Sequence, residues 1–184
     1  MAIGLVVGIP AAFALDRYRF PGKAAFQTIL YLPFVMPGIL FGIALLVFFV
    51  NIGLTLSLVT VVIGHATLMI VVVVVVVSLG LQRWDRTVEQ ASMDLGANEI
   101  ATFLLVTLPN LQTSIVGAVL LGFTLSLDEI VRTFFWTGTE NTLPLYVWSM
   151  MRMNISPEIN AVASIIFVAS ATIVVLWTML RRRK

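Results

Sequence analysis

The sequence predicts an all-α integral membrane protein, and three observations lead to this fold class. Hydrophobic residues make up 60% of the 184 residues and charged residues only 11%, whereas soluble proteins carry about 25% charged residues. The mean hydropathy is +1.06. Long apolar runs recur along the chain, and a helix that spans a bilayer needs about 20 such residues. We therefore expect a single membrane domain over residues 1–184.

Five apolar segments are expected to span the membrane: 1–15, 27–50, 55–81, 111–127 and 159–180. The first is short, and the fourth reaches spanning length only if it continues past Leu127. The run Val71–Val77 has the composition of a strand, but an open strand leaves backbone groups unsatisfied in lipid, so we expect a helix. Pro33 and Pro37 are expected to kink the second segment near its start.

Basic residues orient the expected spans. Of the eleven Lys and Arg residues, nine lie in the 16–26 loop, the 82–110 loop and the C-terminal tail, and two, Arg132 and Arg152, lie on the other side. Because Lys and Arg concentrate in cytoplasmic loops, we expect the N-terminus outside and the C-terminus in the cytoplasm. No Lys or Arg precedes the first apolar run, which argues against a signal peptide.

Several chemistries are excluded by composition and motif. The chain has no Cys and one His, His65, so disulfides, thiolate metal sites and sites with two histidines are impossible. Gly22-Lys23 lacks the upstream glycine of a P-loop, and neither a His-Glu-x-x-His nor a Gly-x-Ser-x-Gly motif occurs. We therefore expect no catalytic residues, no metal site, no bound cofactor and no nucleic-acid partner. His65 is expected to serve a helix contact.

The 82–110 loop is unusually polar for this chain. A helix is predicted over 85–95, with positions that share one face at helical spacing: Val88, Ala91, Ser92 and Leu95. Gly96 is a natural left-handed C-cap, and Asn98 is a candidate N-cap for a second helix that ends or bends at Leu108-Pro109. The pattern alone also fits an amphipathic helix that lies at the membrane interface.

This loop resembles the EAA loop of permease subunits from bacterial binding-protein-dependent ABC importers. That pattern reads EAA, three residues, Gly, nine residues, an aliphatic residue, one residue and Leu-Pro. Aligned on Gly96, the pattern falls on these residues: Gln90, Ala91, Ser92, Val106, Leu108 and Pro109. Gln90 replaces the glutamate of the pattern, and Glu89 stands one residue earlier as a source of the charge. The resemblance implies an ATPase-coupling role for eight residues: Glu89, Gln90, Ala91, Ser92, Asp94, Gly96, Leu108 and Pro109.

Further stretches resemble spermidine/putrescine permeases, namely residues 17–23 (RYRFPGK), 123–129 (FTLSLDE) and 143–161. Such permeases have six spans in a type I, MetI-like fold. Five are expected here, so the first is missing and Met1 is expected within or near the second. A truncated gene, a late start or a partial sequence would produce this arrangement.

The resemblance implies a non-catalytic permease subunit in the bacterial inner membrane. Its implied partners are a dimer of ABC ATPase subunits, which carry ATP and Mg, a second permease subunit, a periplasmic solute-binding protein and membrane lipid. The implied substrate is a polyamine or a related cationic solute. Two alternatives remain: an importer permease for another small solute, and a truncated membrane scaffold that does not transport.

The periplasmic segment 128–158 holds the candidate pathway residues. Asp128 and Glu129 are adjacent acids at the end of a span, a position that favours a functional role, and they are expected to attract a cation unless they pair with Arg132 or face water. Three aromatic residues are candidates to stack on a cation or to anchor at the interface: Trp136, Tyr146 and Trp148.

Two helices are predicted around this segment. A short interfacial helix is expected at residues 143–148, where proline suits the first turn. The last span is expected to start at Ser156-Pro157-Glu158, with Ser156 as the N-cap and Pro157 as the first helical residue.

Overall fold

The computed structural model describes residues 1–153 and 157–182, which are helical with connecting turns and contain no strand. The predicted all-α class is confirmed. The chain divides into two compact units, one from Met1 to Glu140 and one from Asn141 onward. Each unit is described by itself below.

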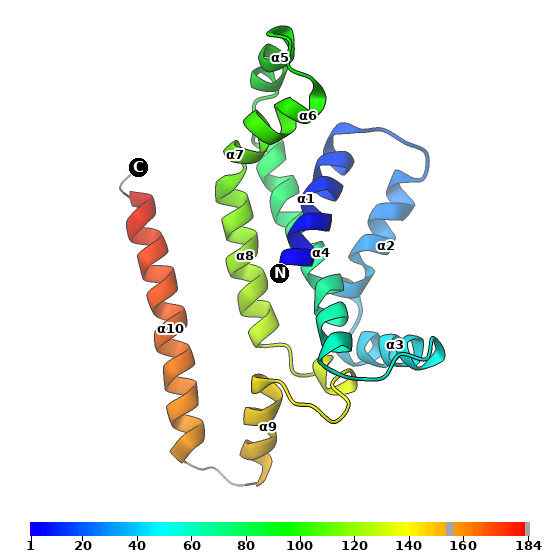
Figure 1. Cartoon of the computed structure of the whole chain (residues 1–184), viewed down its shortest axis with the longest axis vertical. Coiled ribbons are helices and arrows are strands. Elements are labelled where there is room, and N and C mark those ends of the chain that lie inside the picture. The colour runs from blue at the N-terminus through cyan, green and yellow to red at the C-terminus, as the bar shows by residue number, and fades with distance from the viewer. Residues whose placement is uncertain (154–156, 183–184) are drawn as a thin grey trace. The chain divides into compact units, whose positions relative to one another are not determined.

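The first unit contains most of the helices (Figure 1). In chain order they are α1 (Ala2–Arg17), α2 (Lys23–Val35), α3 (Gly38–Asn51), α4 (Leu58–Gln82), α5 (Thr87–Asp94), α6 (Glu99–Thr102), the π-helix η1 (Phe103–Thr107), α7 (Leu108–Asn110), α8 (Gln112–Leu127) and the 3₁₀-helix η2 (Thr133–Phe135).

Helix α4 is the centre of this unit and packs against both α1 and α8. It begins with a capping box in which the Ser57 backbone N–H donates to Thr60 Oγ1 at 2.8 Å. The run Val71–Val77 is helical, as expected for lipid. The buried core of the three helices consists of Ala12, Leu15, Val73, Val74, Val77, Leu81, Leu111 and Ala118.

Helix α1 approaches α4 closely because small residues recur every four positions along it. Gly4, Gly8 and Ala12 are all buried. A Cβ atom added at Gly8 would lie 2.7 Å from Val73 Cγ1, closer than packed carbon atoms approach. The contact is therefore of the small-xxx-small type that lets membrane helices pack backbone to backbone.

The second predicted span, 27–50, is two helices rather than one kinked helix. α2 and α3 are bent by 109° at a short break. Met36, which precedes Pro37, has extended backbone angles, φ −66° and ψ 141°. A residue before proline is driven out of the helical region by the proline ring, so the chain breaks here. The expected kink was therefore underestimated.

A second core holds α3, α4 and η2 together around Trp136. Its buried members are Phe49, Val61 and Trp136. The indole Nε1–H donates to the Gly42 carbonyl oxygen at 3.0 Å. The Thr60 hydroxyl donates to the Trp136 carbonyl oxygen at 2.6 Å. The indole N–H and the backbone carbonyl of Trp136 thus both have hydrogen-bond partners inside the protein, as burial requires.

The expected five spans are not established by the helix lengths. Within the described residues, α4 and residues 160–179 are each long and apolar enough to cross a membrane, and up to four crossings result if each bent pair forms one span. The second bent pair joins residues 99–110 to α8 at 65°. Helix α8 ends at Leu127 and does not continue past it. Additional span length comes instead from the helical residues 99–110 that precede α8.

The second unit contains α9 (Leu143–Met153) and α10 (Pro157–Arg182). The predicted helix over 143–148 is confirmed and continues further, while its place at the interface stays a prediction. α10 begins at Pro157 as expected. The proposed N-cap Ser156 and the tail residues Arg183 and Lys184 lie outside the described residues.

Candidate functional site

The first helix of the 82–110 loop ends in a rigid glycine turn. Gly96 has φ +93°, a region that side chains with a Cβ rarely adopt. Its N–H donates to the Met93 carbonyl oxygen at 2.9 Å, and the Ala97 N–H donates to the Ser92 carbonyl oxygen at 3.2 Å. These two bonds form a Schellman motif, so the predicted left-handed C-cap is confirmed.

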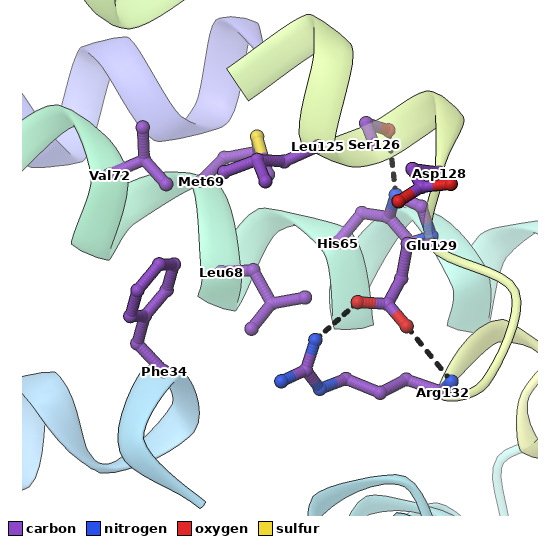
Figure 2. A pocket seen from close by; sticks show the side chains of 10 residues that line it. All are labelled: Phe34, His65, Leu68, Met69, Val72, Leu125, Ser126, Asp128, Glu129 and Arg132. Atoms are coloured by element: carbon purple, nitrogen blue, oxygen red, sulfur yellow. Dashed lines mark hydrogen bonds and ion pairs between the residues drawn. The ribbon is translucent and has the colours of Figure 1, made fainter. Parts of the chain in front are cut away.

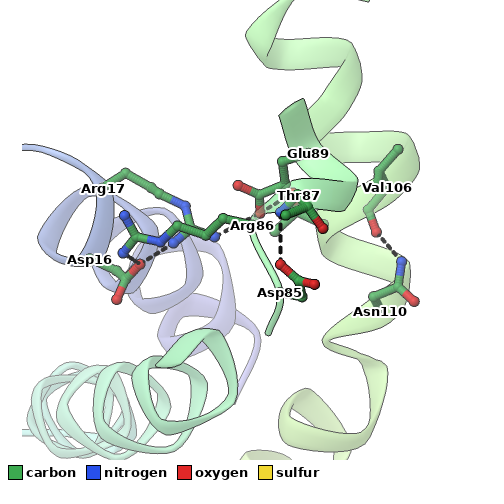
Figure 3. Close-up of polar contacts among 9 residues, drawn as sticks. Asp16, Arg17, Asp85, Arg86, Thr87, Glu89, Val106 and Asn110 are labelled. Atoms are coloured by element: carbon green, nitrogen blue, oxygen red, sulfur yellow. Dashed lines mark hydrogen bonds and ion pairs between the residues drawn. The ribbon is translucent and has the colours of Figure 1, made fainter. Parts of the chain in front are cut away.

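The second helix of the loop starts at the predicted cap and contains a π-helical turn. The Asn98 side chain accepts a hydrogen bond from the Ala101 N–H at 2.8 Å. The Leu108 N–H reaches back five residues to the Phe103 carbonyl oxygen. Pro109 follows without an N–H to donate, and the Asn110 side chain donates to the Val106 carbonyl oxygen at 2.6 Å (Figure 3). The end or bend predicted at Leu108-Pro109 comes just after these residues: the helix ends at Asn110 and is bent by 65° from α8.

The eight coupling candidates divide between the two sides of the loop. Five are exposed: Gln90, Ala91, Asp94, Gly96 and Pro109. Ser92 and Leu108 are half-buried, and the Ser92 hydroxyl shares a hydrogen bond with the Thr102 hydroxyl at 3.1 Å. Leu95, beside the glycine turn, is 90% exposed. Gln90, Ala91, Asp94 and Leu95 thus form an exposed tip of the loop that no other part of the described chain covers.

Glu89 alone among these candidates is buried, with 7% of its surface exposed. Its Oε1 accepts a hydrogen bond from Arg17 Nη2 at 2.7 Å (Figure 3). It also accepts one from the Thr107 hydroxyl at 2.9 Å. The carboxylate therefore points into the chain and not toward the exposed face of α5. The sequence analysis predicts that the Glu89 charge pairs with an ATPase. This stays a prediction, and the buried position of the carboxylate does not favour it.

Two further carboxylates fix the edges of the loop. Asp85 accepts a hydrogen bond from the Thr87 N–H at 2.9 Å, and this bond lowers the pKa of Asp85. The Tyr18 hydroxyl donates to Glu99 Oε2 at 3.1 Å. Because the Glu99 carboxylate accepts this hydrogen bond from the protonated phenol and its charge disfavours a phenolate nearby, the pKa of Tyr18 is raised.

A second group of candidates gathers where α8 ends, around His65 of α4 (Figure 2). His65 Nδ1 lies 2.8 Å from the Ser126 hydroxyl and Nε2 lies 2.8 Å from the Thr133 hydroxyl. The Thr133 hydroxyl donates to the Glu129 carbonyl oxygen at 2.6 Å. The ring therefore joins α4, α8 and η2, which agrees with the expected helix-contact role.

The two adjacent acids have different surroundings. The Glu129 carboxylate pairs with the Arg132 guanidinium, and the Arg132 backbone N–H also donates to Glu129 Oε1 at 3.0 Å. Asp128 is exposed and lines a cleft of about 100 Å³ together with His65, Glu129 and Arg132. The residues that the structure describes give the Asp128 side chain no hydrogen bond or ion pair. We call this feature the Asp128 cleft.

The three aromatic candidates lie in distinct settings. Trp136 is fully buried in the core of the first unit and has no exposed ring face for a ligand in this conformation. Tyr146 is 51% exposed. The Arg152 guanidinium lies 3.9 Å from the centre of the Trp148 ring, so a cation from the chain itself already stacks there.

Sequence reasoning missed several partners in both places. Arg17 and Thr107 hold Glu89, and Ser126 and Thr133 hold His65. Arg17 and Glu89 are 72 positions apart, so no local pattern joins them. The helical phase of Glu89 gave no signal either, because Glu89 lies opposite to the apolar Ala91 and Leu95, which are the exposed positions in the structure.

Comparison with known proteins gives one family for nearly the whole chain. Residues 4–183 match the family described as binding-protein-dependent transport system inner membrane component. The match crosses both compact units.

Curated relatives align over almost all of the chain. The putrescine transport system permease protein PotI of Escherichia coli is 37% identical over 96% of this chain and 66% of its own length. The spermidine/putrescine transport system permease protein PotC of Haemophilus influenzae is 34% identical over 98% of this chain and 71% of its own. The sulfate transport system permease protein CysT of Salmonella typhimurium is 30% identical over 90% and 65%. The chain thus spans about two thirds of the length of these relatives.

Proposed function

Because the chain belongs to the binding-protein-dependent transport system inner membrane component family, we propose that it is a transmembrane permease subunit of an ATP-driven importer. Polyamines such as putrescine and spermidine are the proposed substrates, supported by the names of PotI and PotC. The subunit itself is non-catalytic. It binds no cofactor, and ATP with Mg belongs to the partner ATPase.

The exposed tip of the 82–110 loop is the observation that carries this proposal. Gln90, Ala91 and Asp94 share the exposed side of α5, and Leu95 is 90% exposed beside the Gly96 turn. The two hydrogen bonds of the Schellman motif fix the backbone at the end of this short helix. This tip is the proposed contact with a dimer of cytoplasmic ATPases.

The remaining partners follow from the same architecture. A second permease subunit completes the pathway, and a periplasmic solute-binding protein delivers the substrate. In this arrangement the 82–110 loop and the C-terminus face the cytoplasm of a bacterium, the N-terminus faces outside, and the spans contact lipid. ATP binding and the loaded binding protein each shift a two-state equilibrium of the whole assembly.

The Asp128 cleft is the proposed contact for the cationic substrate. Asp128 carries a carboxylate without a partner among the described side chains, whereas the charge of Glu129 is already matched by Arg132. An unpaired acid near the end of a membrane helix attracts an ammonium group. The cleft lies within the first unit, so it does not depend on the placement of the second.

Uptake measurements test the proposed substrate. The gene is deleted in its source bacterium, and uptake of radiolabelled putrescine and of radiolabelled sulfate is measured before and after the chain is restored. We expect putrescine uptake to fall and to recover on restoration, with sulfate uptake unchanged. Loss of sulfate uptake alone would indicate a permease for another small solute. Unchanged uptake of both, with no ATPase purifying with the chain, would indicate a scaffold that does not transport.

A further inference from the structure

Four alternating charges link the end of α1 to the start of α5 (Figure 3). Arg17 Nη2 lies 2.7 Å from Glu89 Oε1, and Arg86 Nη2 lies 3.0 Å from Asp16 Oδ2. Arg17 also pairs with Asp16 through Nη1. Two consecutive residues of α1 therefore hold two positions at the beginning of α5.

The inner part of this chain of charges is buried. The side chains of Arg17, Asp16 and Glu89 are 11%, 11% and 9% exposed, whereas Arg86 is 57% exposed. An exposed pair contributes little. Removing one partner of a buried pair instead leaves an unpaired charge in a poorly solvated place, which is strongly unfavourable. The Arg17–Glu89 pair is therefore the part that fixes the position of α5.

Glu89 also reaches a third element. The Thr107 hydroxyl of η1 donates to Glu89 Oε1 at 2.9 Å, and Thr107 is 1% exposed. η1 continues through α7 toward α8, while α1 packs against α4. Glu89 therefore contacts α1 and also η1, the segment that leads to α8, and these are the two helices that pack against the central helix.

We propose that Arg17 and Glu89 are positioning residues that make the 82–110 loop and the α1–α4–α8 bundle move as one body. This inference rests on the proposed function, in which the exposed tip of the loop contacts an ATPase. Glu89 acts inside the permease and not on the partner, because its carboxylate is buried while Gln90 and Asp94 occupy the exposed side. The pair determines how much of the ATPase motion reaches the transport pathway.

The absence of native cysteines makes a distance measurement straightforward. Spin labels are placed at Leu95→Cys and Val62→Cys, both exposed positions at 90% and 55%, in the full chain in lipid nanodiscs. Double electron–electron resonance spectroscopy then measures the distribution of distances between the spin label on the loop and the one on α4. We expect a narrow distribution for the parent and a broad one for Arg17→Gln, Glu89→Gln and Thr107→Val.

Two comparisons separate positioning from a general defect. Asp94→Asn removes an acid from the exposed side of the same helix, and we expect it to leave the distribution narrow. The double variant Arg17→Gln with Glu89→Gln is expected to be no worse than the poorer single variant, because it leaves no buried charge without its partner. Additive broadening in the double variant, or broadening by Asp94→Asn, would contradict a specific pair.

The functional readout is putrescine uptake per ATP hydrolysed in proteoliposomes that hold the purified complex. We expect Arg17→Gln and Glu89→Gln to keep ATP hydrolysis and to lose at least about fivefold in this ratio, the lower end of usual coupling between sites. Broad distances with an unchanged ratio would overturn the coupling role, as would narrow distances in both variants. If the parent takes up no putrescine, the proposed substrate fails, and the distance measurement still decides whether the pair holds the loop.

Discussion

Replacing Gly96 with isoleucine is expected to uncouple transport from ATP hydrolysis while the protein still inserts into the membrane. The φ of +93° at Gly96 costs an L-residue about 1–2 kcal/mol. A Cβ atom there would meet no other atom within 4 Å, so the whole cost is backbone strain. A change of this size shifts the population of the native turn by roughly 5- to 30-fold. The two Schellman hydrogen bonds at Gly96 and Ala97 are lost with it.

The matched control is Gly53→Ile. Gly53 also has positive φ, +73°, and a Cβ atom there also meets nothing within 4 Å, but it lies in the α3–α4 connection, far along the chain from the 82–110 loop. Both variants are compared for ATP hydrolysis and radiolabelled putrescine uptake in proteoliposomes, with membrane insertion checked by fractionation. Uptake per ATP should fall in Gly96→Ile alone. Parent-like uptake in Gly96→Ile would refute the docking role of this turn.

Three other predictions concern packing, substrate and pH. Gly8→Ala should destabilise the fold by about 1–3 kcal/mol, because the new Cβ overpacks the contact with α4, and so lower the melting temperature in detergent. Gly117→Ala, whose Cβ meets its nearest atom at 4.0 Å, should leave the melting temperature unchanged; equal effects would count against the close α1–α4 contact. Asp128→Asn should raise the KM for putrescine and Asp128→Glu should largely preserve it; an unchanged KM in Asp128→Asn would remove the cleft as a cation contact. The raised pKa of Tyr18 means that its contact with Glu99 stabilises the fold below pH 10 and is lost as pH rises through the folded pKa, so Glu99→Gln should lower that pKa in an ultraviolet titration.

Local features of the fold were predictable because they depend on neighbouring residues. The left-handed turn at Gly96 and the cap at Asn98 follow from side-chain chemistry over a few positions. The helical state of Val71–Val77 follows from the need to satisfy backbone groups in lipid. These predictions were confirmed by backbone geometry and cap hydrogen bonds.

Features that depend on contacts between distant segments were not predictable from one sequence. The 109° angle between α2 and α3 needs the proline break and also the packing of α3 against η2. Of the adjacent acids Asp128 and Glu129, the sequence does not show which one pairs with Arg132. In the structure Arg132 pairs with Glu129, which leaves Asp128 without a partner among the described side chains. The partnership of Arg17 and Glu89 likewise exists only once α1 lies beside α5.

Cross-linking from the tip of the 82–110 loop tests the central claim most directly. Leu95→Cys gives the chain a single thiol on an exposed side chain. A thiol-directed photo-cross-linker is attached there in native membranes, and the cross-linked products are identified by mass spectrometry. We expect a cross-link to an ATPase subunit that contains a P-loop, and no such cross-link from Val62→Cys on α4. Absence of any ATPase product from position 95, with the loop intact, would contradict the importer account and favour a helix that lies at the membrane interface.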